Sequence, residues 1–193
     1  MPYPIYKPFI SQIEKDLVNN CLDTTWISSK GHYIEMFEKE VSKYTGVKYA
    51  VAVSNGTVAL HLALLVYDIG VDDEVILPDF TYIATANSVL YVNANPVFCD
   101  VNINDWNLDL NKIADKITSK TKAIMIPNIY GNPANFDAIN KIEKKHNLIV
   151  IEDSAESLGA KYKGKMSGNL GDISTLSFFG NKTITTGEGG MVL

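Results

Sequence analysis

The sequence contains no arginine. All 17 basic residues among its 193 residues are lysines. Because arginine is the usual bidentate partner of carboxylate and phosphate groups, an anion bound here must be held by lysines, backbone amides, hydroxyl groups or residues from elsewhere. The net charge is −5, without a basic stripe. This charge argues against a nucleic-acid backbone as the main partner, since few counterions could be replaced.

Cysteine and histidine are also scarce. Cys21 and Cys99 are too few and too far apart for a disulfide framework or a zinc site. His32, His61 and His146 lack metal-ligand spacing, so we predict no metal site. The P-loop, the G-x-G-x-x-G fingerprint and the G-x-S-x-G elbow are all missing. Without a signal-peptide core or an apolar run of about 18 residues, we expect a cytoplasmic protein with no membrane partner.

What the sequence does contain is an alternation of strand-like and helical segments. Apolar residues make up 46% and charged residues 20%, as in ordinary globular proteins. We expect helices at 11–24, 32–44, 58–66, 82–91, 108–117 and 134–146, and strands at 49–53, 74–77, 96–101, 123–126, 148–152 and 173–178. Continuous Val- and Ile-rich strands between helices indicate a three-layer α/β/α fold with a mostly parallel sheet. No linker divides the chain, so we expect one domain over residues 1–193.

Polar and aromatic residues follow five of the predicted strands, at the point where each strand ends. These segments are 54–57, 78–82, 127–131, 152–156 and 178–182. In an open α/β sheet, ligands bind at the edge where the carboxyl ends of the strands gather. The sequence therefore predicts a binding site at this edge.

Two charged residues of these segments could carry chemistry. Lys182 precedes a glycine-rich stretch and is either a solvated lysine or an amine that forms a Schiff base with a carbonyl cofactor. Asp153 follows an apolar strand, where burial would raise its pKa unless it has a partner. A protonated pyridine nitrogen would be such a partner, and a helix N-cap is the structural alternative.

Four more residues could bind a flat, phosphorylated ligand. Gly56 and Thr57 lie between a strand and a helix, where free amides and a hydroxyl suit a phosphate; taken alone, the motif favours the alternative, an ordinary tight turn with a hydroxyl N-cap. Ser177 could add a hydrogen bond to that phosphate or face solvent. Tyr82 could stack on a ring or belong to the core.

Together these segments resemble the DegT/DnrJ/EryC1/StrS family, sugar aminotransferases of fold type I that use pyridoxal 5′-phosphate. The matching segments are 26–31, 37–38, 53–63, 78–84, 129–131, 151–156 and 177–191. The resemblance implies that Lys182 holds the cofactor and moves the proton during transfer, while Asp153 pairs with the ring nitrogen. It implies that Tyr82 stacks on the ring and that the phosphate is bound by Gly56, Thr57 and Ser177. Glu156 stands where many relatives carry glutamine or histidine near the ring hydroxyl.

The resemblance also implies partners. Glutamate would donate the amino group to a nucleotide-linked ketosugar, in surface-glycan synthesis. The closing stretch is most similar to members that aminate GDP-4-keto-6-deoxymannose; dTDP- and UDP-linked ketosugars remain alternatives. Family members are nearly twice as long, with a smaller C-terminal domain, and form homodimers with shared sites. We therefore expect an incomplete large domain, and a non-catalytic fragment that keeps the fold is the alternative.

Overall fold

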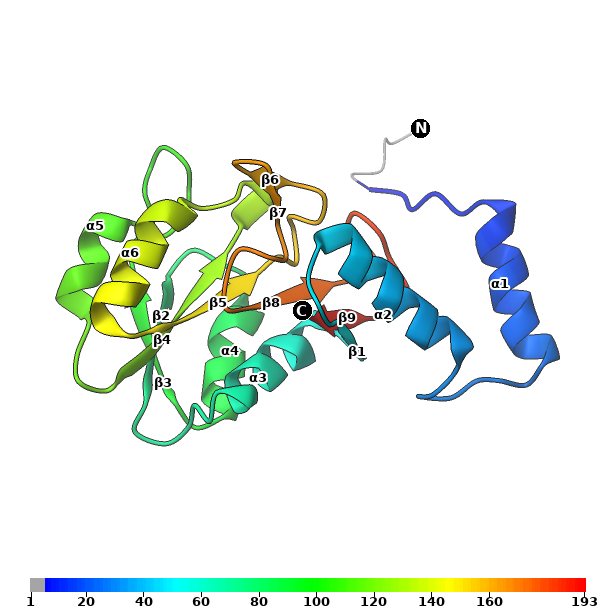
Figure 1. Cartoon of the computed structure of the whole chain (residues 1–193), viewed down its shortest axis with the longest axis horizontal. Helices are drawn as coiled ribbons and strands as arrows, with labels where there is room; N and C mark the ends of the chain where they lie inside the picture. The colour runs from blue at the N-terminus through cyan, green and yellow to red at the C-terminus, as the bar shows by residue number, and fades with distance from the viewer. Residues whose placement is uncertain (1–5) are drawn as a thin grey trace.

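A single mixed sheet forms the centre of the molecule in the computed structural model, which describes residues 6–193 (Figure 1). Within these residues the sheet has seven strands in the order β1-β9-β8-β5-β4-β2-β3. They are β1 (Val51–Val53), β2 (Glu74–Pro78), β3 (Asn95–Cys99), β4 (Thr121–Pro127), β5 (Ile149–Asp153), β8 (Ile173–Ser177) and β9 (Gly190–Val192). Strand β9 pairs antiparallel with both β1 and β8, and the other strand pairs of this sheet are parallel. The predicted mostly parallel α/β sheet is confirmed.

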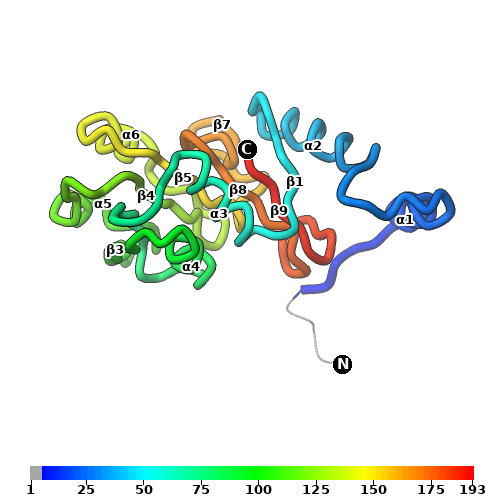
Figure 2. Tube along the Cα trace, turned by 90° about the horizontal axis from the view of Figure 1, so that it is seen from below, coloured from blue at the N-terminus to red at the C-terminus, as the bar shows by residue number. Residues whose placement is uncertain are grey.

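Helices cover both faces of the sheet. They are α2 (His32–Thr45), α3 (Gly56–Val66), α4 (Ile83–Tyr91), α5 (Leu110–Ile113) and α6 (Phe136–His146), whereas α1 (Gln12–Asp23) does not pack on the sheet. On β4, Met125 packs with residues of α3 and α4, whereas Ile124 packs with residues of α5 and α6. Helix α2 packs beyond them, against β8 and β9 (Figure 2). Burial on both faces is why the strands have continuous apolar sequences.

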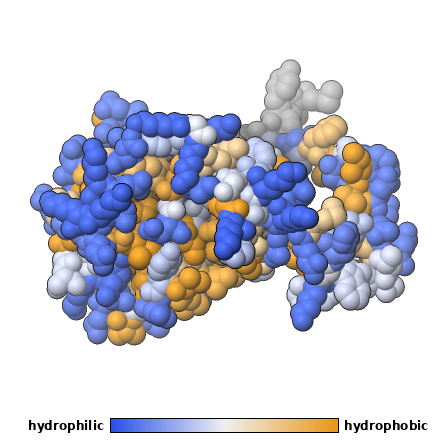
Figure 3. Space-filling model, in the orientation of Figure 1, coloured by the Kyte–Doolittle hydropathy of each residue, from blue (hydrophilic) through white to orange (hydrophobic). Residues whose placement is uncertain are grey.

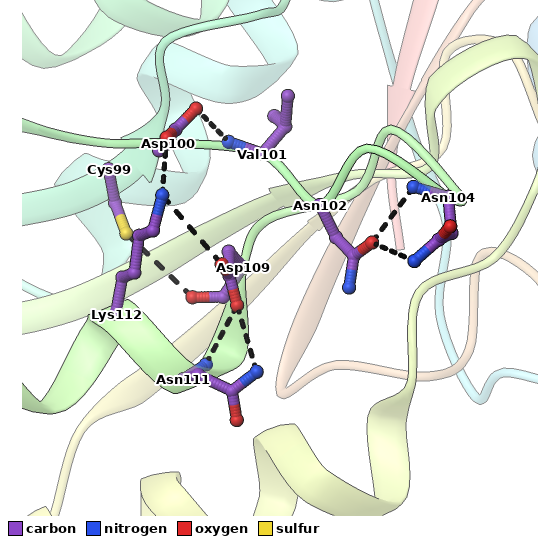
Figure 4. A network of polar contacts seen from close by, with 8 residues as sticks. All are labelled: Cys99, Asp100, Val101, Asn102, Asn104, Asp109, Asn111 and Lys112. Carbon is purple, nitrogen blue, oxygen red and sulfur yellow. Dashed lines mark hydrogen bonds and ion pairs between the residues drawn. The ribbon is translucent and has the colours of Figure 1, made fainter.

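The segment from β3 to α5 differs from its prediction. The expected helix at 108–117 is a single turn, α5, followed by a 3₁₀ turn at Ala114–Lys116. The side chain of Asp109 accepts the Asn111 N–H and thereby caps this short helix. Lys112 forms ion pairs with Asp100 and Asp109 across the loop (Figure 4). Local caps and ion pairs thus fix an irregular loop where periodicity indicated a longer helix.

Two strand pairings were not predicted. The strands β6 (Lys161–Tyr162) and β7 (Lys165–Met166) form a hairpin around Lys163 and Gly164, which both have positive φ. Strands of two residues are too short for any periodicity to reveal them. The insertion of β9 between β1 and β8, antiparallel to both, was not predicted either.

Helix α1 stands apart from the sheet (Figures 1 and 2). Ser11 and Glu14 form the capping box that begins it. None of its residues is buried, and its apolar side chains Ile13, Leu17 and Leu22 are exposed. Among residues 6–193, no helix combines the length and apolar content needed to cross a bilayer.

Candidate active site

A cavity of about 350 Å³ lies at the carboxyl edge of the sheet. All seven residues singled out from the sequence line it: Gly56, Thr57, Tyr82, Asp153, Glu156, Ser177 and Lys182. They come from the segments that follow β1, β2, β5 and β8 and from the last residues of β5 (Asp153) and β8 (Ser177). The predicted convergence is therefore present, whereas the chemical role of each residue stays a prediction.

One end of the cavity is the start of α3. Asn55 caps this helix, since its side chain accepts the Val58 N–H at 2.9 Å. The next amides of the first turn have no partner within the helix and can bind an anion. A Cβ on Gly56 would lie 2.9 Å from Cβ and 3.2 Å from Oγ of Ser177. Glycine is therefore required for Ser177 to approach the helix start. The free amides and the Thr57 and Ser177 hydroxyls form a cradle that suits a phosphate and contains no arginine.

Asp153 lies in the floor of the cavity and is only 8% exposed. Its Oδ1 accepts the Ala155 N–H at 3.1 Å, and its Oδ2 accepts the Thr85 hydroxyl at 3.4 Å. Burial raises the pKa of Asp153 to about 6, against the opposing effects of the Ala155 bond and of nearby Lys182. A turn rather than a helix follows β5, so the N-cap alternative is wrong. A buried carboxylate of this kind suits a cationic ring nitrogen.

Lys182 faces the cavity from the segment after β8. Its Nζ lies 3.6 Å from Oε1 of Glu156, and its side chain is 18% exposed. Oε2 of Glu156 accepts the Tyr130 N–H at 2.7 Å. Tyr130 has the left-handed backbone conformation φ 51°, ψ 26°, so Glu156 supports a strained turn and the lysine together. Sequence reasoning did not predict either contact of Glu156.

Tyr82 lies at the rim of the cavity. It is the N-cap residue of α4 and its side chain is 72% exposed. The alternative that Tyr82 belongs to the core is therefore wrong. An exposed aromatic ring at a rim can cover one face of a flat ligand.

A buried carboxylate beneath the cavity was missed as a structural centre. Glu152 is fully buried, and its side chain points to the sheet face opposite to that of Asp153. Its two oxygens accept five hydrogen bonds of 2.7–3.0 Å, from Asn128 Nδ2, Ser167 Oγ, Gly168 N, Leu170 N and Ser174 Oγ. Glu152 thus ties β8 and the turn at 167–170 to Asn128, which lines the cavity. Only the rarity of a glutamate inside an apolar strand could have signalled this role.

Comparison with known proteins identifies the family. Residues 8–193 match the DegT/DnrJ/EryC1/StrS aminotransferase family. The chain belongs to this family. GDP-perosamine synthase of Escherichia coli O157:H7 is 55% identical over 190 residues, which cover 98% of this chain and 52% of that protein. The chain therefore spans about half the length of the curated relatives it matches.

Solved structures of the family agree with the fold. The aminotransferase from Psychrobacter cryohalolentis superposes with a TM-score of 0.95 at 41% identity, over 99% of this chain and 49% of that one. The PLP form of a sugar aminotransferase from Streptococcus pneumoniae superposes with a TM-score of 0.95 at 32% identity. The match covers 98% of this chain and 52% of that one. Membership of the DegT/DnrJ/EryC1/StrS family confirms the predicted fold, and it confirms pyridoxal phosphate as the family's cofactor.

Proposed function

We propose that this chain is the cofactor-binding part of an aminotransferase that uses pyridoxal phosphate and acts on a nucleotide-linked ketosugar. The observation that carries the proposal is the placement of Lys182, Asp153 and the Gly56–Ser177 cradle on one cavity. Pyridoxal phosphate, when bound, supplies an electron sink for the carbon that loses its proton. The residues of the cavity fit each part of this cofactor.

Lys182 would hold the cofactor covalently through Nζ. Once the amino donor has released it, the free amine would take the proton from the donor's α carbon and return one during transfer. Glu156 lies within 3.6 Å of Nζ and is its counter-ion. The Lys182 side chain is therefore held at its base by the backbone after β8 and at Nζ by the Glu156 carboxylate.

The remaining residues would bind and orient the ring. Asp153 would pair with the ring nitrogen, and a positive partner would favour its ionised form. Tyr82 would cover one face of the ring. The free amides at Gly56 and Thr57, with the Thr57 and Ser177 hydroxyls, would hold the phosphate.

We further propose GDP-4-keto-6-deoxymannose as the acceptor and glutamate as the amino donor. The support is the 55% identity to a relative named GDP-perosamine synthase. That relative is about twice as long, so turnover is tested both on this chain and on a protein that also contains the remaining part.

We also propose a homodimer formed through the face of α3 and α4. Apolar side chains on this face are exposed, namely Val58, Leu65, Val66, Ile83, Leu90 and Tyr91. Figure 3 shows apolar atoms gathered over α3, near the centre of the molecule. Because Tyr82 precedes α4 at the cavity rim, a second copy on this face would border the site.

The first experiment asks whether the chain holds the cofactor through Lys182. The purified protein is mixed with pyridoxal phosphate, and the visible spectrum and borohydride-stable labelling are recorded. We expect a protein-bound absorption band and label in the wild type, and neither in Lys182→Ala. Absence of both from the wild type would refute the cofactor site.

The second experiment asks for turnover. Glutamate should convert the bound cofactor to its amine form, and GDP-4-keto-6-deoxymannose should restore it, while the dTDP- and UDP-linked ketosugars restore it more slowly. If glutamate leaves the spectrum unchanged, the chain keeps the fold and the cofactor without the activity.

A further inference from the structure

Thr85 is a buried polar residue in helix α4, whose other buried polar residue is Ser88. It lies on the first turn of α4 and is completely buried. Threonine in a helix usually bonds the carbonyl one turn earlier. Among the hydrogen bonds of the described residues, its Oγ1 instead contacts two side chains: Asp153 Oδ2 at 3.4 Å and Thr81 Oγ1 at 3.0 Å. The hydroxyl thus faces the sheet and the cavity rather than its own helix.

The three side chains form a directed chain. An ionised carboxylate can only accept, so Thr85 donates to Asp153 and its oxygen is left to accept the Thr81 hydroxyl. Thr81 lines the cavity. Protonation of Asp153 would allow both bonds to reverse. The chain therefore links the buried carboxylate to the cavity wall through two hydroxyls.

The charged groups that act on Asp153 come from two segments. Lys182, after β8, favours the ionised form, and Glu156, after β5, opposes it. From the helix layer above, α4 contributes only the Thr85 hydroxyl. Because Asp153 is buried, this hydroxyl takes the place of a solvent donor that water would otherwise supply.

We propose that Thr85 is a positioning residue for Asp153: with Thr81 it fixes the orientation of the carboxylate and favours its ionised form. The inference deepens the proposed function, since an ionised, oriented Asp153 is what a ring nitrogen requires. Thr85 is not among the residues that line the cavity. It acts through Asp153.

The test compares Thr85→Val, which has the same shape without the hydroxyl, with Thr85→Ser, which restores the hydroxyl. The cofactor-free proteins carry ¹³C-labelled aspartate, and Asp153→Asn assigns the resonance of the Asp153 carboxyl. The carboxyl shift is followed over roughly pH 4 to 8. We expect the titration midpoint of Asp153 to rise by about one pH unit in Thr85→Val and to return toward the wild-type value in Thr85→Ser.

Thr45→Val is the matched control. Thr45 is also a buried helical threonine, but its hydroxyl bonds the Val41 carbonyl in α2, away from the cavity. This variant should lose stability comparably and leave the midpoint of Asp153 unchanged. An unchanged midpoint in Thr85→Val, or an equal shift in Thr45→Val, would overturn the proposal.

A second readout uses the cofactor. The dissociation constant of pyridoxal phosphate should rise as the pH falls, because Asp153 becomes protonated. In Thr85→Val this rise should begin at a higher pH than in the wild type. Equal pH profiles for the two proteins would contradict the role of Thr85 while leaving the cofactor site intact. If the wild type binds no cofactor, the proposed function fails, whereas the carboxyl titration still decides the role of Thr85.

Discussion

Single atoms decide the shape of the phosphate cradle. A methyl group on Gly56 would meet the Ser177 side chain at 2.9 Å, so one of the two must move. Overpacking of this kind costs about 1–3 kcal/mol. We predict that Gly56→Ala raises the dissociation constant of pyridoxal phosphate by about tenfold or more.

Gly70→Ala is the control for this substitution. Its nearest neighbour would be the Val92 carbonyl oxygen at 3.6 Å, an ordinary contact. Cofactor titrations and melting curves of both variants separate a local clash from general loss of stability. Wild-type affinity in Gly56→Ala would show that the cradle adapts and that glycine is not required there.

Asp153 should make stability fall as pH rises. Burial raises its folded pKa from 3.8 to about 6, so between these values the folded protein holds a proton that the unfolded chain has lost. Stability contributed by this group is therefore present below the unfolded pKa and is lost as pH rises through about 6, by about 3 kcal/mol. We predict that Asp153→Asn gains stability relative to the wild type over this window, measured by urea unfolding without cofactor. A constant difference would exclude a raised pKa.

At the scale of elements, Glu152 holds together segments that are distant in sequence. Three of its five donors are N–H groups: the Asn128 side-chain amide and the backbone amides of Gly168 and Leu170. Unlike a hydroxyl, an N–H group cannot rotate to accept a hydrogen bond. The NH₂ group of a glutamine would face at least one donor, whichever way it turned. We predict that Glu152→Gln lowers the free energy of unfolding by about 3 kcal/mol.

Glu40→Gln provides the matched control, because Glu40 is exposed on α2. Its effect should lie within about 0.5 kcal/mol. Denaturant unfolding of both variants makes the comparison. If both substitutions changed the free energy of unfolding by a similarly small amount, the hydrogen bonds of Glu152 would not be needed for stability.

The elements that could be predicted are those whose sequence shows their burial. Strands β4 and β5 have apolar residues facing both helix layers, so continuous Val and Ile indicated them to within a few residues. The site residues that follow these strands could be placed on one edge for the same reason. Strands β6 and β7 have two residues each, and the position of β9 depends on pairing with residues far away in the chain.

Thr85 and Glu152 could not be predicted for a related reason. Thr85 fits the pattern of α4, and Glu152, although unusual in an apolar strand, does not show in the sequence which residues it contacts. Their contacts depend on how the helix and the 167–170 turn sit against β5. Tertiary packing brings these partners together, so the local sequence pattern does not indicate the contacts.

At the scale of the whole molecule, the exposed apolar face of α3 and α4 predicts self-association. Leu90 is 53% exposed on α4, and Leu90→Lys would place a charge in the proposed interface. We predict that the variant sediments at lower mass than the wild type at the same concentration. Val71→Lys changes a similarly exposed loop residue, 72% exposed, and should sediment as the wild type does. Equal masses for all three proteins would exclude this face.

The place of β9 in the sheet has a consequence for the order of folding. β1 is joined to the sheet only through β9, and Gly190 packs against the backbone of Asn55, where a Cβ would lie 2.4 Å from the Asn55 carbonyl carbon. The two sides of the cradle, at Gly56 and Ser177, therefore come into register only after residues 190–192 have paired. Such a long-range contact forms slowly during folding. On a ribosome, the chain would gain its affinity for a phosphate only after β9 has emerged.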